Sequence, residues 1–177
     1  MKTGGNHKQH IALRPFGEAD FAAFDRFGTE PEAAGAFRRS GFVDSQALRR
    51  RFAADGLLGA TSSAVAVVVD DAVAGMATWE AADRGGPVGG CYEIGVTLLP
   101  DHRGHGVGTR AHQLLAEHLF RFTSAHRLEA FTDTENLAVQ RVLEKTGFHR
   151  EGLLCQATWR DGTYRDAIVY GLLRSEA

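Results

Sequence analysis

Cysteine and long apolar runs are both scarce in this sequence. Only Cys91 and Cys155 occur in 177 residues, too few for a disulfide framework. No apolar run approaches the roughly 18–20 residues that a membrane-spanning helix needs. An excess of positive charge is also missing, since 20 Lys and Arg stand against 22 Asp and Glu. We therefore expect no membrane partner and no nucleic-acid partner.

The N-terminus lacks the apolar core of a signal peptide, because residues 1–10 are mostly polar. We expect these residues to form a flexible tail. Residues 11–177 are expected to form one domain around one core, since no linker interrupts them. Without a signal peptide, and with both thiols expected to stay reduced, the predicted location is cytoplasmic.

What the sequence does contain is an alternation of strand-like and helix-like segments, which predicts an α/β fold. Strands are expected at 11–15, 64–69, 73–79, 91–98, 127–132, 148–160 and 163–173, and helices near 21–27, after 44–45, at 107–122 and at 136–146. The dipeptide Asp161-Gly162 between the last two strands is the strongest hairpin signal in the chain. The central strand–helix–strand unit should be parallel with a right-handed crossover.

The helix ends and faces can also be predicted. Asp44 or Ser45 is expected to cap the second helix, and Asn136 the last one, which should stop at a left-handed Gly147. Helical spacing in the central helix predicts an inward face. Its members are Val107, Ala111, Leu114, Leu115, Leu119 and Phe122.

A glycine-rich loop, residues 100–109, joins a predicted strand to the central helix. Its glycines let the backbone approach a ligand, and the first helix amides have no intrahelical partner, so the loop suits a phosphate or pyrophosphate. A kinase-type phosphate loop needs a lysine that is missing here, and a dinucleotide fingerprint needs glycine where Thr109 stands. The remaining pattern is Arg103-x-x-Gly106-x-Gly108. A purely structural tight turn is the alternative.

This pattern resembles the acyl-CoA pyrophosphate loop of the GNAT superfamily of N-acyltransferases. The strand 93–98 before it is similar to the family's bulged strand that pairs with pantetheine. Asn136 and the segment 142–148 are similar to the helix signature that follows the loop. The opening strand 11–15 and the terminal hairpin 151–170 resemble the branch of ribosomal-protein N-terminal alanine acetyltransferases (RimJ/RimL-like).

The resemblance implies a mixed, mostly antiparallel twisted sheet of about seven strands flanked by about four helices. Its central parallel strands splay apart to form the cofactor cleft. It implies an N-acyltransferase domain over 11–177 that moves an acetyl group from acetyl-CoA to a primary amine by direct attack in a ternary complex. The cofactor contacts that it implies are Val96, Thr97, Leu98, Arg103, Gly104, His105, Gly106, Val107, Gly108, Thr109 and Asn136.

The sequence offers two catalytic candidates, but it has no proton donor at the positions where the family often has one. Glu93 is the candidate base, since burial in a strand raises a carboxyl pKa, and the family often has a carboxylate there; a glutamate bonded to backbone or arginine is the alternative. Asn136 is expected to bond the pantetheine arm or a water, with a plain helix cap as the alternative. Leu143 stands where many relatives have Tyr, and Val139 where the ribosomal branch often has Ser. Since a thiol has a pKa of about 8.5, a general acid can be dispensable.

Several alternatives stay open at this point. One alternative keeps the reaction and changes the donor to a longer acyl-CoA or another thioester. Another alternative is that the chain is a non-catalytic CoA-binding sensor or interaction module. The acceptor is a small-molecule or peptide amine, chosen by segments 28–59 and 81–90; a homodimer is left open. No metal site is predicted, and His102 and His105 are expected to flank the phosphates. Cys155 is expected to be a small buried hydrophobe, with a nucleophilic role as the alternative.

Overall fold

The computed structural model describes residues 9–37, 44, 46–85 and 89–177. The predicted N-terminal tail therefore lies outside the described residues except for its last two. One of these, His10, is tied to the sheet. Its amide donates to the Asp70 carboxylate at 2.8 Å, and its carbonyl accepts from the Asp70 amide at 2.9 Å.

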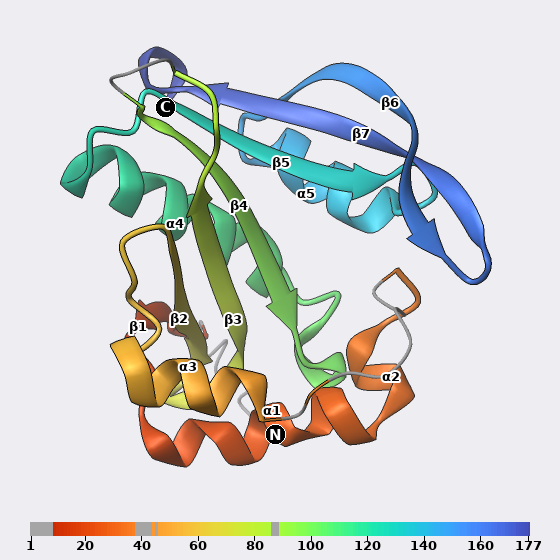
Figure 1. Ribbon diagram of the computed structural model, residues 1–177. Coiled ribbons are helices and arrows are strands. Elements are labelled where there is room, and N and C mark those ends of the chain that lie inside the picture. Colours follow the sequence, from red (N-terminus) through yellow and green to blue (C-terminus); the bar gives the residue numbers. More distant parts are fainter. Residues whose placement is uncertain (1–8, 38–43, 45, 86–88) are drawn as a thin grey trace, which may run out of the picture.

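The strands form one seven-stranded sheet in the order β1-β2-β3-β4-β5-β7-β6 (Figure 1). Neighbouring strands are antiparallel except β4 and β5, which are parallel. The strands are β1 (Ile11–Arg14), β2 (Ser62–Val69), β3 (Ala72–Ala81), β4 (Cys91–Leu98), β5 (Arg127–Asp133), β6 (His149–Arg160) and β7 (Thr163–Leu173). The predicted mixed, mostly antiparallel sheet is confirmed, and each strand end lies within two residues of its predicted position.

Helices cover both faces of the sheet, with α1 and α3 on one and α4 and α5 on the other (Figure 1). They are α1 (Phe21–Thr29), α2 (Pro31–Ala34), α3 (Ala47–Asp55), α4 (Val107–Phe122) and α5 (Leu137–Lys145). Strand β2 serves both faces, since its side chains alternate. Ala64 and Ala66 pack in the cluster with α1, whereas Val65 and Val67 pack in the cluster with α4. No helix in the described part is long and apolar enough to cross a membrane.

The helix ends agree only partly with the prediction. Helix α2 was not expected, because four residues are too few to show a helical period. Gln46 occupies the N-cap position of α3, and Asp44 accepts a hydrogen bond from its amide at 2.9 Å instead of capping the helix. Ser45 lies outside the described residues. Asn136 caps α5 and Gly147 follows it at φ +88°, as predicted.

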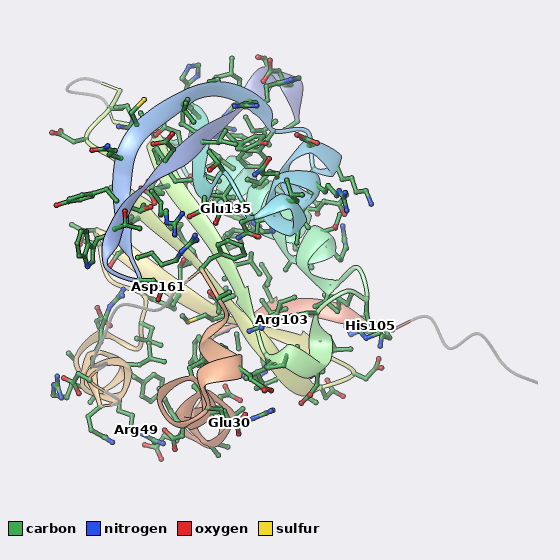
Figure 2. All side chains as sticks on the ribbon, turned by 90° about the vertical axis from the view of Figure 1, so that its right-hand side faces the viewer. Glu30, Arg49, Arg103, His105, Glu135 and Asp161 are labelled. Atoms are coloured by element: carbon green, nitrogen blue, oxygen red, sulfur yellow. The ribbon has the colours of Figure 1, made fainter. Side chains whose placement is uncertain are left out.

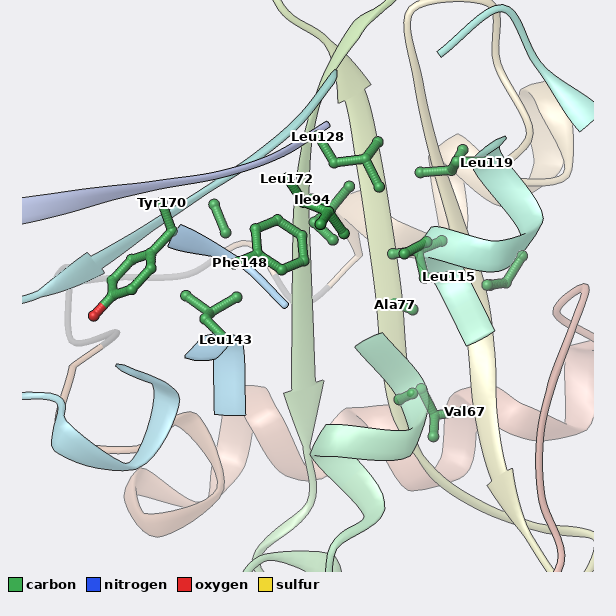
Figure 3. Close-up of a cluster of buried hydrophobic side chains, with 14 of the residues drawn as sticks. Val67, Ala77, Ile94, Leu115, Leu119, Leu128, Leu143, Phe148, Tyr170 and Leu172 are labelled. Carbon is green, nitrogen blue, oxygen red and sulfur yellow. The ribbon is translucent and has the colours of Figure 1, made fainter. Parts of the chain in front are cut away.

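The larger core lies between the sheet and helices α4 and α5 (Figure 3). Leu115 and Leu119 of α4 are fully buried in it, as helical spacing predicts. Phe122 was expected to face inward but is 67% exposed. It lies in the last turn of α4 beside His118, with the two ring centroids 5.1 Å apart, so the buried face ends before the helix does.

Truncation of Leu115 to Ala is expected to lower the free energy of unfolding by about 2–5 kcal/mol, because it leaves a cavity in a fully buried site. Phe122→Ala removes a larger but exposed side chain and should change this free energy by no more than about 0.5 kcal/mol. Urea unfolding followed by circular dichroism measures both. Equal losses would contradict the burial of these two side chains.

Candidate active site

The two parallel strands remain paired over only a short stretch. Residues 91–93 of β4 pair with residues 127–129 of β5, and beyond them the strands diverge (Figure 1). A cavity of about 520 Å³ lies in the opening. Its lining comes from β2 to β5, from α3, α4 and α5, from the hairpin end of β6, and from Phe37 and Ala167. The predicted splaying of the central strands is confirmed. Elements on both faces of the sheet line the cavity, since His112 belongs to α4 and Arg51 to α3.

Strand β4 differs from the prediction in two details. Its register with β3 runs without a shift from Tyr92 to Leu98, so the expected bulge is absent from this pairing. Val96 and Thr97 line the cavity, whereas Leu98 does not. The first turn of α4 covers Leu98, whose Cδ1 lies 3.6 Å from the point that a Cβ on Gly108 would occupy.

The glycine loop before α4 leaves backbone donors unused. Gly104 and Gly106 have φ angles of +79° and +80°, which favour glycine, and no heavy atom lies within 4 Å of a Cβ built on either. Gly106 is the N-cap of α4. Within the described residues, the amides of 105–109 donate no hydrogen bond. Unused donors at the positive end of a helix dipole suit an anion.

The Arg103 side chain fastens this loop to α2 (Figure 2). Its guanidinium donates to the carbonyls of Leu98 at 2.9 Å, Glu32 at 3.1 Å and Ala33 at 2.5 Å. His105, on the same loop, is exposed (Figure 2). Because the guanidinium already has three protein acceptors, we expect its effect on an anion to act mainly through the loop backbone that it holds.

Arg103→Ala is expected to weaken CoA binding by only about 3- to 10-fold, that is by about 1 kcal/mol. The same change should lower the free energy of unfolding by roughly 1–3 kcal/mol, since the partly buried Ala33 carbonyl loses its donor. Calorimetric titration and urea unfolding measure the two effects. A hundredfold loss of affinity would mean that the guanidinium itself binds the pyrophosphate.

Glu93 lies half-buried on β4 and lines the cavity. The sheet register places it opposite Glu80 of β3 and beside Glu129 of β5. Glu129 is paired with two arginines, because it accepts from Arg84 at 2.9 Å and from Arg127 at 2.8 Å. Burial, and then the negative charge of Glu80, raise the pKa of Glu93 above its ordinary value. Within the described residues, Glu93 has no hydrogen-bonded or ionic partner.

Asn136 serves as a helix cap and also lines the cavity. Its Oδ1 accepts from the Val139 amide at 3.3 Å, which is the structural role that the sequence left open. Its Nδ2 has no hydrogen-bond acceptor in the described part of the chain. Val139 and Leu143 line the same wall with aliphatic side chains, so neither position offers a proton donor.

His112 of α4 also lines the cavity, although it is not among the site residues predicted from the sequence. Its side chain is 4% exposed, and Nδ1 lies 2.8 Å from the Gly108 carbonyl, so Nδ1 carries the hydrogen. Nε2 is therefore an acceptor, and burial lowers the pKa of the ring, which favours the neutral form. The signal was its position, four residues after Gly108 and three before Leu115, on the buried helix face.

The end of β6 forms another wall. Arg160 is buried there and donates to Asp133 at 2.5 Å and Glu135 at 2.7 Å, while the Phe37 ring lies 4.9 Å from its guanidinium.

Cys155, in the middle of β6, is exposed and does not line the cavity, so the expectation of a buried thiol is wrong. The reason is that β6 is the edge strand of the sheet. In the described ranges, no three His, Cys, Asp or Glu side chains are grouped to hold a metal.

The model of the acetyltransferase (GNAT) domain family matches residues 10–149 of this chain. One curated relative is Probable N-acetyltransferase YjcK of Bacillus subtilis, 36% identical over 83 residues, which are 47% of this chain and 46% of that protein. The chain spans about half the length of the curated relatives it matches.

Solved structures resemble nearly the whole chain. Spermidine N-acetyltransferase from Vibrio cholerae, in complex with CoA and spermine, has a TM-score of 0.80 at 16% identity, over 94% of this chain and 96% of that one. RimJ from Mycobacterium smegmatis, in complex with CoA-disulfide, has a TM-score of 0.77 at 24% identity, over 94% of this chain and 83% of that one. At these identities the likeness shows the fold. Because the family model covers most of the sequence, the chain belongs to the GNAT acetyltransferase family.

Proposed function

We propose that this protein transfers an acetyl group from acetyl-CoA to a primary amine by direct attack in a ternary complex. One observation carries the proposal: the cavity between β4 and β5 is lined by His112 of α4, whose N-terminal loop has unused amides, and by Glu93, which projects from the opposite face of the sheet. A donor with a pyrophosphate and an acceptor with an amine can therefore enter from opposite faces of the sheet and meet inside it.

The residues of the glycine loop fit CoA. Their amides have no competing partner in the described residues, and two glycines leave open space where a Cβ would block a close approach. Acetyl-CoA, when bound, supplies an acyl group activated as a thioester. The residues proposed to hold it are Val96, Thr97, Arg103, Gly104, His105, Gly106, Val107, Gly108, Thr109 and Asn136, with Leu98 as a supporting residue beneath the loop.

Glu93 is the proposed base. An amine with a pKa of about 8 to 10.4 is mostly protonated at neutral pH and must lose a proton before it can attack. The raised pKa of Glu93 makes its carboxylate a better acceptor for that proton, directly or through a water. The amine nitrogen then forms its bond to the acyl carbon as the carbon–sulfur bond breaks. A thiol with a pKa of about 8.5 can leave as thiolate, so the aliphatic Val139 and Leu143 are compatible with turnover.

The acceptor class and the compartment are proposals as well. Structures of the same fold include a spermidine N-acetyltransferase and RimL, a ribosomal L7/L12 α-N-protein acetyltransferase, so both small-molecule and peptide amines are candidates here. The two cysteines are free thiols in the structure, which suits the reducing cytoplasm.

Calorimetric titration with acetyl-CoA and with CoA, followed by thiol release on a panel of amines, tests the proposal. Binding with release on at least one amine is the expected result. Binding without release on any amine would favour a CoA-binding sensor, and release only with longer acyl-CoA would change the donor. If neither CoA form binds, the cofactor assignment is wrong.

A further inference from the structure

Two carboxylates face each other at the cavity. The β3–β4 register places Glu80 directly opposite Glu93, and both side chains line the cavity. Directly opposed residues on antiparallel strands project from the same face, with Cβ atoms about 5 Å apart, and two like charges there destabilise the sheet. This arrangement, called here the carboxylate pair, carries a cost that a bound cation would remove.

The nearby arginines offset the charge of the carboxylate pair only in part. Burial and the charge of Glu80 raise the pKa of Glu93 by more than the charge of Arg84 lowers it. Arg84 donates to Glu129 at 2.9 Å, and Arg160 holds the two carboxylates described above. Arg51 donates to a backbone carbonyl and lies 4.0 Å from a carboxylate of its own helix. Over the residues that the structure describes, neither member of the pair has an ion-pair partner. Among the described lining residues, three carboxylates (Glu80, Glu93 and Asp133) therefore stand against two arginines (Arg51 and Arg160), and both arginines already have protein acceptors.

The remaining wall is suited to an apolar chain. Phe37, Phe131 and Trp159 line the cavity, and Phe37 and Trp159 are 39% and 59% exposed. Aromatic rings pack against methylene groups and attract cations to their faces. An acceptor with a carboxylate near its amine would meet the two negative charges of the carboxylate pair, and the arginines among the described lining residues already have acceptors.

From this charge balance we infer that the acceptor is an amine with a second positive charge, joined to the first by a methylene chain, and that Glu80 binds the second charge while Glu93 receives the reacting amine. The inference rests on the proposed function and narrows its acceptor. Glu80 acts as a specificity residue: it touches the far ammonium group and takes no part in bond breaking.

Three amines of equal chain length test the inference: 1,4-diaminobutane, butylamine and 4-aminobutanoate. Thiol release is measured at pH 8 with saturating acetyl-CoA. We expect kcat/KM for the diamine to exceed that for butylamine about tenfold, as one added ion pair of about 1.4 kcal/mol predicts. The value for 4-aminobutanoate should be lower than that for the diamine by about a hundredfold or more, since its carboxylate is repelled.

Glu80→Gln isolates the proposed contact. It should lower kcat/KM for the diamine about tenfold more than kcat/KM for butylamine, mainly through KM. Any loss of basicity at Glu93, whose pKa the charge of Glu80 helps to raise, affects both amines and cancels in this comparison. Glu18→Gln, which removes an exposed carboxylate outside the cavity, is the matched control and should change neither value. Calorimetric binding of the diamine to the CoA complex gives a second readout that does not need turnover.

The outcomes separate the inference from the proposed function. If kcat/KM for butylamine or for 4-aminobutanoate equals that for the diamine, the inference about the acceptor is wrong, but the proposed acetyltransferase function stands. If no amine on the wider panel is acetylated, the function fails, and the binding experiment still decides the inference: equal affinity for diamine and butylamine, or no change in Glu80→Gln, overturns it.

Discussion

Glu93→Gln is expected to lower kcat by roughly 10²- to 10⁴-fold, the usual contribution of a general base, while CoA binding stays within about twofold of wild type. The substitution keeps the size of the side chain and removes only its ability to accept a proton. Glu93 is half-buried without an ionic partner among the described residues, so no ion pair is lost with the charge. Thiol release and calorimetric titration measure the two quantities separately.

The pH dependence gives an independent check. Burial raises the pKa of Glu93, so its basic form is lost as the pH falls through a value above the ordinary carboxyl value of about 4.3. In the CoA complex, kcat should therefore fall on the acid side, and this limb should be missing from the residual activity of Glu93→Gln. Glu117→Gln, an exposed carboxylate of α4 outside the cavity, is the control. Turnover within tenfold of wild type in Glu93→Gln would exclude Glu93 as the base.

Gly106→Glu is expected to abolish CoA binding, with a loss of at least about a hundredfold, or 2.7 kcal/mol. Two effects combine at this residue. A side chain at φ +80° is strained, and a carboxylate in front of the unused amides occupies and repels the place proposed for the pyrophosphate. Calorimetric titration with CoA measures the loss.

Matched variants separate strain from blocking. Gly106→Ala carries most of the strain without the charge and should lose less affinity than Gly106→Glu. Gly56 ends α3 at φ +65° with open space around it, so Gly56→Glu adds the same side chain under similar strain away from the loop. It should lower stability by about 1 kcal/mol and leave CoA binding unchanged. Intact affinity in Gly106→Glu would mean that the cofactor binds elsewhere.

Local patterns were sufficient for most of the fold. Strands β4 and β7 have the predicted ends, because a run of apolar or alternating residues between turn signals depends on nearby sequence alone. The cap at Asn136 and the stop at Gly147 were predictable for the same reason. The wrong predictions concern residues whose burial depends on tertiary surroundings. Phe122 has helical spacing but is exposed at the end of α4, and Cys155 lies on an edge strand.

The sequence by itself determined the order of the strands and of the four longer helices, the parallel central pair and the glycine loop with its unused amides, since these follow from local patterns and from the connections between neighbouring elements. Only the tertiary structure decided what surrounds the reacting groups. His112 enters the cavity because α4 packs across the sheet, and Arg103 is occupied because α2, distant in sequence, offers it carbonyls. Glu80 meets Glu93 because of strand register, a long-range property that no local spacing encodes.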